Sequence, residues 1–166
     1  MHLSILHFCI EALEGYAFEK FSKAVNELGI SSGIAQELKG PITTIDKLID
    51  AKDHTLITIT SPHEEIVGYL KYGVKHLYFY RKNGMVEECS PYCLLDFYVK
   101  EDMQRSGLGL KLFYSFLEAN NSTHPSKVAY DRPSQKLLCF VSKHFDLIHP
   151  DAQPNRYTIF EEFWAS

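Results

Sequence analysis

The first fifty residues carry apolar side chains at helical spacing. Four of them recur every three or four positions: Phe18, Phe21, Val25 and Leu28. We expect this helix to stop at Gly29, because glycine commonly follows the last helical turn. Ser31 and Ser32 can then cap a second, short helix that carries Gln36 and ends before Pro41.

A third helix is expected to open at Thr43, which stands three residues before Asp46 as in a capping box. Its inward face consists of Ile45, Leu48 and Ile49. The apolar residues 1–10 lack the cationic start and the small-residue cleavage site of a signal peptide. We therefore expect them to form an element of the fold.

The pattern changes to that of β-strands near residue 56. Residues 56–60 alternate, and residues 66–80 form a longer β-branched and aromatic run that we expect to bend at Gly73. Asn83-Gly84 is favoured by two-residue hairpin turns, so the chain should return antiparallel. Residues 93–99 are apolar except for Asp96, which predicts a strand buried on both faces. A buried Asp96 needs a partner, such as a cation, and we interpret it as structural.

Strands and helices alternate in the second half. A helix at residues 108–120 has a buried stripe of Leu108, Leu112, Phe116 and Leu117. Residues 128–130 form a short strand, Pro133 opens a helix that ends near His144, and residues 157–163 form the last strand. The sum is a mixed α/β fold in which a largely antiparallel central sheet is flanked by helices, in one domain covering residues 1–166.

Composition excludes several classes of function. The formal net charge of −4 opposes binding to nucleic acid. No apolar run approaches the roughly 20 residues of a membrane helix, so no membrane partner is expected. We expect reduced thiols at the four cysteines, Cys9, Cys89, Cys93 and Cys139, in a chain without a secretory signal. Cys89 and Cys93 have no second ligand pair to complete a zinc site, so we expect no metal.

The segment from Gln104 to Gly109 suits an anion. Glycines at 107 and 109 allow a tight turn whose N–H groups point outward at the start of the predicted helix, and Arg105 adds a cation. The dinucleotide fingerprint would need a small residue where Leu112 stands, and the P-loop pattern is absent. The remaining pattern, Gln-x-x-Gly-x-Gly, resembles the pyrophosphate loop of GCN5-related N-acetyltransferases.

Longer stretches extend the resemblance to one family within that superfamily. They read Pro91-Tyr92-Cys93-Leu94-Leu95-Asp96-Phe97-Tyr98-Val99, Asp131-Arg132-Pro133-Ser134-Gln135-Lys136-Leu137-Leu138, and Ile34-Ala35-Gln36-Glu37-Leu38. Over residues 36–163, in the same order, the chain is similar to the catalytic domain of the α-tubulin N-acetyltransferase family. The resemblance implies transfer of an acetyl group from acetyl-CoA to a lysine in a lumen-facing loop of α-tubulin.

The resemblance also implies site residues. Cys93 and Asp131 match the two catalytic residues, and Gln36 matches a glutamine implicated in catalysis or substrate placement. Two segments, residues 97–110 and 134–143, match the cofactor-binding segments. The candidate contacts to acetyl-CoA are Phe97, Tyr98, Val99, Gln104, Arg105, Ser106, Gly107, Leu108, Gly109, Leu110, Ser134, Gln135, Lys136 and Lys143.

These residue types suit the reaction. A lysine amine has a pKa near 10.4, so fewer than about one in a thousand is nucleophilic at neutral pH and a base must take its proton. Asp131 is a candidate base; alternatively, it satisfies amide donors at a helix N-terminus. Cys93 is a second base, a polarising group or a buried core thiol. We favour direct attack in a ternary complex, with backbone N–H groups of residues 95–99 polarising the thioester, over an acetyl-cysteine intermediate.

The expected partner is the microtubule, met by a monomer in the cytoplasm or in the axoneme of a cilium or flagellum. Residues 66–84 contain no acid and four cations, Lys71, Lys75, Arg81 and Lys82, which could meet the acidic tubulin surface or be a solvated strand face. Two other functions stay open. One is acetylation of another protein lysine or a small amine, and the other is a microtubule-binding module with weak catalysis, against which the presence of both Cys93 and Asp131 argues.

Overall fold

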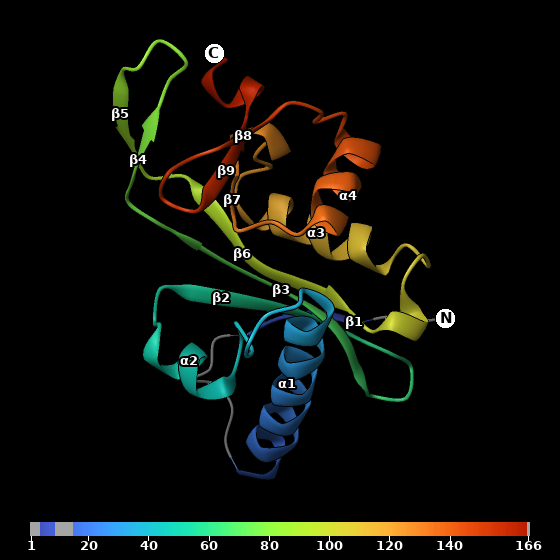
Figure 1. Cartoon of the computed structure of the whole chain (residues 1–166). Coiled ribbons are helices and arrows are strands. Elements are labelled where there is room, and N and C mark those ends of the chain that lie inside the picture. The colour runs from blue at the N-terminus through green and yellow to red at the C-terminus, as the bar shows by residue number, and fades with distance from the viewer. Residues whose placement is uncertain (1–3, 9–14, 166) are drawn as a thin grey trace. The chain divides into compact units, whose positions relative to one another are not determined.

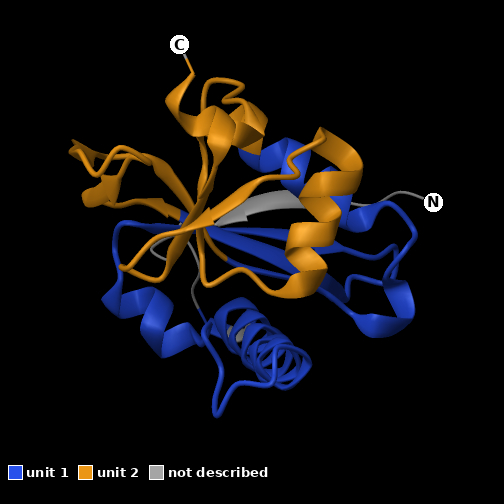
Figure 2. Cartoon of the chain, turned by 45° about the horizontal axis from the view of Figure 1, so that its top comes forward, with its two compact units in different colours: residues 1–72, 96–116 blue, residues 73–95, 117–166 orange. Residues whose placement is uncertain are grey.

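The structure is a computed structural model that describes residues 4–8 and 15–165 (Figure 1). It divides into two units, each built from two separate stretches of sequence. Unit 1 consists of residues 1–72 and 96–116, and unit 2 of residues 73–95 and 117–166 (Figure 2). Strands β3 (Ile66–Val74) and β6 (Tyr92–Val99) contribute to both units. The expectation of a single domain over residues 1–166 stays a prediction.

The main sheet is mixed and largely antiparallel, as expected. Its strand order is β1-β2-β3-β6-β7-β9-β8, with bounds Ser4–Phe8 for β1, His54–Thr60 for β2, Ala129–Asp131 for β7, Pro150–Ala152 for β8 and Tyr157–Phe160 for β9. β1 pairs antiparallel with β2, and β9 pairs antiparallel with both β7 and β8. The β6–β7 pair is parallel.

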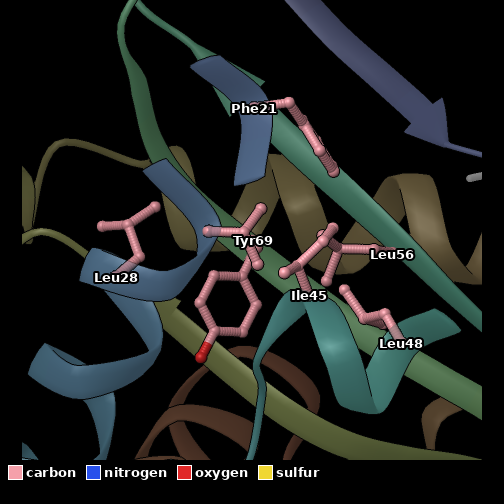
Figure 3. Close-up of a cluster of buried hydrophobic side chains, with 7 residues drawn as sticks. Phe21, Leu28, Ile45, Leu48, Leu56 and Tyr69 are labelled. Atoms are coloured by element: carbon pink, nitrogen blue, oxygen red, sulfur yellow. The ribbon is translucent and has the colours of Figure 1, made fainter. Parts of the chain in front are cut away.

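In unit 1, helices cover both faces of the strands. Helices α1 (Gly15–Ala35) and α2 (Ile45–Asp50) pack on one face, where an apolar cluster consists of Phe21, Val25, Leu28, Ile45, Leu48, Leu56 and Tyr69 (Figure 3). Helix α3 (Leu108–Ala119) contacts the other face through ring pairs Tyr72–Phe116 and Phe97–Phe113, whose centroids are 4.9 and 6.2 Å apart. The predicted apolar stripe of α3 is buried.

Helix α1 does not stop at Gly29, so the prediction of two helices there is wrong. Gly29 lies inside the helix, where an added Cβ would come within 2.0 Å of the Thr43 carbonyl oxygen. At Gly33 the nearest atom would be the Gly40 carbonyl oxygen, at 3.0 Å. The two glycines therefore allow residues 40–43 to cross close to the helix, and Gln36 follows directly after its end.

Helix α2 begins one residue later than the capping box predicted. Thr44 is its N-cap, and the Thr44 Oγ1 accepts a hydrogen bond from the Lys47 backbone N–H at 3.1 Å. Ile45 and Leu48 are buried as expected, but Ile49 is 43% exposed, because a helix of six residues turns only one narrow stripe toward the core.

In unit 2, the expected long strand is two strands. β3 ends at Val74, and β4 (Leu77–Tyr80) pairs with β5 (Val86–Cys89) in a separate two-stranded sheet, so the break falls after Gly73 and not at it. The antiparallel return is confirmed. The Arg81 N–H donates to the Met85 carbonyl, which leaves three turn residues instead of two, and Gly84 has a φ of +87°.

The remaining elements differ from expectation at their ends. Helix α4 (Gln135–Phe145) is capped by Ser134, whose Oγ accepts from the Leu137 N–H at 3.2 Å, so Pro133 precedes the helix. β9 stops at Phe160 and continues as a 3-10 turn, while β8 was not predicted. Of residues 1–10, the strand Ser4–Phe8 agrees with expectation and the others lie outside the described residues. No helix in the described part has the length and apolarity to cross a membrane.

The close approach at Gly29 predicts a large effect of one methyl group. Gly29→Ala should lower the free energy of unfolding by about 3 kcal/mol or more, because the backbone at Thr43 must move. Urea unfolding followed by circular dichroism measures this. Gly40→Ala is the matched control, since a Cβ there meets no atom within 4 Å, and its effect should stay within about 1 kcal/mol. Equal effects of the two substitutions would contradict the packing.

Candidate active site

The strand register of unit 2 places three reactive side chains on one face of the sheet. Cys93 stands beside Ala129 in the β6–β7 pair, and Asp131 stands opposite Tyr157 in the β7–β9 pair. Paired residues point to the same face, as do residues two apart on a strand. Cys93, Asp131 and Tyr157 therefore share a face, and Cys93 and Tyr157 belong to one apolar cluster.

Cys93 is fully buried, and its Sγ lies 3.5 Å from the Pro91 carbonyl oxygen. Burial raises the pKa of this thiol to about 12; the Lys75 backbone N–H and positive charge oppose the rise, and the negative charge of Asp131 adds to it. At neutral pH the side chain is a protonated thiol. It can donate a proton, but it cannot act as a base at neutral pH, because it still carries its own proton.

Asp131 does not fill the alternative role that the sequence allowed, that of satisfying amide donors at a helix N-terminus. Ser134 takes the cap of α4, and the Asp131 Oδ1 is buried without a hydrogen-bond partner among the described residues. The Arg132 Nε lies 3.5 Å from this oxygen in a geometry that makes no hydrogen bond. A buried acceptor without a donor is costly, so this oxygen is available to a proton or to a substrate donor.

Sequence reasoning missed Tyr157. Burial is the main cause that raises its pKa, and the negative charge of Asp131 and the charge that Cys93 gains on ionisation add to it. The phenol is therefore neutral at physiological pH, beside the two predicted catalytic residues. Its place depends on the pairing of β7 with β9, a contact that no local pattern indicates.

In unit 1, Gln36 lies in a hydrogen-bond network around Asp96. Asp96 is 3% exposed and accepts from Ser32 Oγ at 3.1 Å, Thr43 Oγ1 at 2.7 Å and Tyr69 OH at 2.5 Å. The Gln36 Nε2 donates to Ser32 Oγ at 2.9 Å and reaches Asp96 Oδ1 at 3.3 Å. These donors are neutral groups and not the cation that we gave as an example of a partner, and the interpretation of Asp96 as structural stays a prediction.

Asp96 also occupies a donor that the thioester was expected to use. The Phe97 backbone N–H donates to Asp96 Oδ1 at 2.9 Å. This N–H belongs to residues 95–99, which were expected to polarise the thioester carbonyl. Because the Phe97 N–H already donates to the carboxylate, only the other N–H groups of residues 95–99 stay candidates for that role.

The loop before α3 has the features of an anion site. Arg105 and Gly107 have φ values of +65° and +84°, and Gly107 immediately precedes the helix. Glycine has no side chain to cap the first N–H groups of the helix, and a Cβ at Gly107 would meet no atom within 4 Å, so the space beside this residue is open. Gln104 anchors the loop by donating from Nε2 to the Val99 carbonyl at 2.8 Å.

Other residues of the first cofactor segment line β6 and the start of α3. Phe97 and Tyr98 are half-buried and Val99 is buried in β6, while Leu108 is buried and Gly109 and Leu110 are half-buried in α3. Arg105 and Ser106 are exposed. This segment is in unit 1, with Gln36.

The second predicted cofactor segment is in unit 2. Ser134 caps α4, and Gln135, Lys136 and Lys143 are exposed on that helix. Gln135 and Lys143 also line a depression of about 450 Å³ beside residues 147–150. The structure thus brings Cys93 and Asp131 together in unit 2 and joins Gln36 to Asp96 in unit 1.

The stretch without acids does not form a free basic patch. Lys71 is 4% exposed and its Nζ donates to the Ile42 carbonyl. Arg81 pairs with Glu87 at 2.7 Å, and Lys82 pairs with Glu161 at 3.1 Å. Glu87 lies in β5 and Glu161 in the 3-10 turn after β9. Residues 66–84 alone could not indicate these two ion pairs, because both acids lie outside that stretch.

The cysteines and the acids offer no metal centre in the described part of the chain. Cys89, Cys93 and Cys139 carry free thiols, and Cys9 lies outside the described residues. No group of three or more cysteine, histidine or acidic side chains among the described residues is arranged to hold a metal ion.

Comparison with known proteins identifies the family of the chain. A sequence model of the family described as "GNAT acetyltransferase, Mec-17" matches residues 10–166. The chain belongs to this family. A relative from Plasmodium knowlesi named alpha-tubulin N-acetyltransferase is 41% identical over 151 residues, which cover 90% of this chain and 79% of the relative. Danio rerio alpha-tubulin N-acetyltransferase 1 is 40% identical over 147 residues, covering 86% of this chain and 49% of the relative.

Solved acetyltransferase structures share the fold at low identity. The AtaT mutant toxin bound to acetyl-CoA and an antitoxin segment matches with a TM-score of 0.59 and 13% identity, covering 94% of this chain and 91% of the toxin. A Trypanosoma brucei acetyltransferase matches with a TM-score of 0.53 and 19% identity, covering 86% and 90%. The expected GNAT-like α/β fold and the assignment as an acetyltransferase are confirmed.

The raised pKa of Cys93 predicts a dependence of stability on pH. The folded thiol keeps its proton to about pH 12, whereas the unfolded thiol loses it near pH 8.5. The buried, protonated thiol therefore contributes fully to the free energy of unfolding below about pH 8.5, and this contribution is lost as pH rises toward 12. Between pH 9 and 11, wild type should lose up to about 1.4 kcal/mol per pH unit more than Cys93→Ala. Urea unfolding under reducing conditions measures both, and parallel curves would contradict the buried thiol.

The backbone of the loop predicts a specific loss of acetyl-CoA binding. Gly107→Ala forces a side chain into a left-handed conformation at the helix start, so KM for acetyl-CoA should rise about fivefold or more while KM for the acceptor changes little. Gly84→Ala is the matched control, because Gly84 has a similar φ in the β4–β5 turn. Steady-state kinetics should show no change in KM for acetyl-CoA there, and a comparable rise in both variants would refute the assignment.

Proposed function

We propose that this chain transfers the acetyl group of acetyl-CoA to a lysine of α-tubulin in microtubules. Relatives named alpha-tubulin N-acetyltransferase match nine-tenths of the chain at about 40% identity, as for the Plasmodium knowlesi and Plasmodium vivax proteins. The structural observation that carries the proposal is the Cys93–Asp131 cluster, with one buried carboxylate oxygen that has no hydrogen-bond donor.

The proposal assigns proton removal to Asp131. The lysine ammonium must lose a proton before its Nζ can form the new C–N bond, and the unpartnered Asp131 Oδ1 is the acceptor for that proton, directly or through water. Acetyl-CoA supplies the acetyl group, and its C–S bond breaks as the amide bond forms. The nitrogen loses a second proton as the amide forms, and this proton goes to the departing sulfur, so that coenzyme A leaves as a thiol.

Cys93 has a different role in this scheme. A thiol that keeps its proton to about pH 12 is a poor nucleophile at neutral pH, which favours direct transfer in a ternary complex over an acetyl-cysteine intermediate. The protonated Cys93 thiol, which lies 3.5 Å from the Pro91 carbonyl oxygen, is a polar group on the same face of the sheet as Asp131. Tyr157, neutral and on the same face, lines the same cluster.

The remaining substrate contacts are assigned to residues of unit 1 and to residues of unit 2. The N–H groups at the start of α3, with Arg105 beside them, hold the pyrophosphate of acetyl-CoA. The exposed α4 residues Gln135, Lys136 and Lys143 add contacts to this substrate, and Gln36 contacts the acceptor. The acceptor is a lysine in the lumen-facing loop of α-tubulin, and the enzyme acts as a monomer on microtubules in the cytoplasm or in an axoneme.

A kinetic comparison of acid variants tests the base. Asp131→Asn removes the proton acceptor with little change of shape, so kcat on microtubules should fall about a hundredfold or more. Asp146→Asn is the control, because Asp146 is an exposed residue in the left-handed conformation that asparagine also adopts, and its kcat should stay near that of wild type.

The choice of acceptor separates this function from its alternatives. With labelled acetyl-CoA, wild type should modify α-tubulin in microtubules in preference to histones and polyamines. A preference for a polyamine or a histone would contradict α-tubulin as the acceptor, and the assignment as an acetyltransferase would still hold. Undiminished activity of Asp131→Asn would remove Asp131 as the base.

A further inference from the structure

A buried carboxylate outside the catalytic cluster controls the side chain of Gln36. Five donors reach Asp96, from Ser32 Oγ, Gln36 Nε2, Thr43 Oγ1, Tyr69 OH and the Phe97 backbone N–H. Oδ1 accepts from Ser32, Gln36 and Phe97, and Oδ2 accepts from Thr43 and Tyr69. Every partner donates, so the carboxylate is used entirely as an acceptor.

The direction of each hydroxyl follows from this arrangement. Burial and the charge of Asp96 raise the pKa of Tyr69, so its phenol keeps its proton and donates. The Tyr69 ring packs in the apolar cluster while its oxygen points out of it (Figure 3). Ser32 has a single hydroxyl hydrogen, which it gives to Asp96 Oδ1 at 3.1 Å. The Ser32 oxygen can therefore only accept from Gln36.

The amide of Gln36 is consequently held in one orientation. Its NH2 group must face inward, because both atoms that it meets, Ser32 Oγ at 2.9 Å and Asp96 Oδ1 at 3.3 Å, can only accept. The reversed amide would place its carbonyl oxygen against a carboxylate oxygen, which is repulsive. The carbonyl Oε1 of Gln36 is thereby the end turned away from Asp96. The side chain is half-buried and remains partly accessible.

We propose that Asp96 is a positioning residue that acts through Gln36, by turning the Gln36 carbonyl toward the protein acceptor as a hydrogen-bond acceptor for one of its N–H groups. The inference rests on the proposed function, because the group that the Gln36 carbonyl would bind is an N–H of the protein that is acetylated. It assigns Gln36 the binding of a donor and not the removal of a proton, since a neutral amide is not a base near neutral pH.

The identity of the Asp96 side chain matters because asparagine would release this orientation. An asparagine presents one donor group in place of one oxygen, so the hydroxyls of Ser32, Thr43 and Tyr69 can reverse and the Gln36 amide can turn over. Asp96→Asn keeps the volume of the side chain and should fold. A loss of fixed orientation in Gln36 is then the main consequence for the acceptor.

A double-mutant cycle on the whole chain tests the proposal. Gln36→Ala and Asp96→Asn should each lower kcat/KM for microtubules about tenfold, the loss expected for one oriented hydrogen bond, with KM for acetyl-CoA unchanged. The double variant should be no worse than Gln36→Ala, because Asp96 acts through Gln36. A further tenfold loss in the double variant would overturn the proposal.

Two further variants separate positioning from stability. Tyr69→Phe removes a donor from Oδ2, where Gln36 does not bind, so it should lower thermal stability with kcat/KM within about twofold of wild type. If Asp96→Asn does not fold, Ser32→Ala takes its place in the cycle and should lower kcat/KM with Gln36 present but not in Gln36→Ala. A loss in the Gln36→Ala background, or a tenfold loss in Tyr69→Phe, would show a merely structural role.

A readout without catalysis distinguishes failure of this inference from failure of the proposed function. In nuclear magnetic resonance spectra, the Gln36 side-chain NH2 hydrogens should exchange slowly with water in wild type and in Tyr69→Phe, and quickly in Asp96→Asn. Slow exchange together with no acetylation of tubulin would contradict the proposed substrate and would still support the fixed orientation of Gln36. Fast exchange in wild type would overturn the orientation itself.

Discussion

A carboxylate removed from water must receive hydrogen bonds, and in unit 1 this requirement at Asp96 determines how distant segments meet. Its donors come from the end of α1, from the loop before α2 and from β3. For Ser32 and Thr43 to reach one carboxylate, the helix must continue past Gly29 and residues 40–43 must return close beside it. The absence of a side chain at Gly29 and Gly33 is thus a condition for satisfying the buried acid.

Such a network is not the most stable way to fill a core. Buried charges cost desolvation energy that their hydrogen bonds only partly return, and well-packed apolar groups are often equally stable or more so. What the apolar alternative cannot give is direction. A carboxylate saturated by donors imposes a single hydrogen-bond polarity on Ser32 and, through it, on Gln36. The buried charge at Asp96 therefore lowers the stability of unit 1, but it fixes the orientation of the Gln36 side chain at the end of α1.

Much of this arrangement could be predicted from the sequence where the signal is local. The strand before the loop, the stripe of α3 and the need of Asp96 for a partner follow from periodicity and polarity, and the motifs indicated the family. The partners of Asp96 could not be predicted from the sequence, because Ser32 and Tyr69 are 64 and 27 residues away along the chain. Gly29 was misjudged for the same reason, since a helix-ending glycine and a glycine that admits a crossing segment look alike without knowledge of Thr43. The ion pairs of Arg81 and Lys82 could not be predicted from the basic stretch, because their partners Glu87 and Glu161 lie outside it.

The two acids that the sequence singled out differ in one physical respect, and that difference separates their roles. Asp96 has every oxygen engaged by donors, so no lone pair is left for a substrate proton. Asp131 has one buried oxygen without a donor, beside a thiol that holds its own proton. A fold that could satisfy Asp96 so fully could equally have placed a hydroxyl against Asp131, as it placed Ser134 on α4 three residues later. The unmet hydrogen-bond demand at Asp131 is therefore a feature of unit 2 that packing alone does not explain, and proton transfer from an incoming amine is chemistry that would meet it.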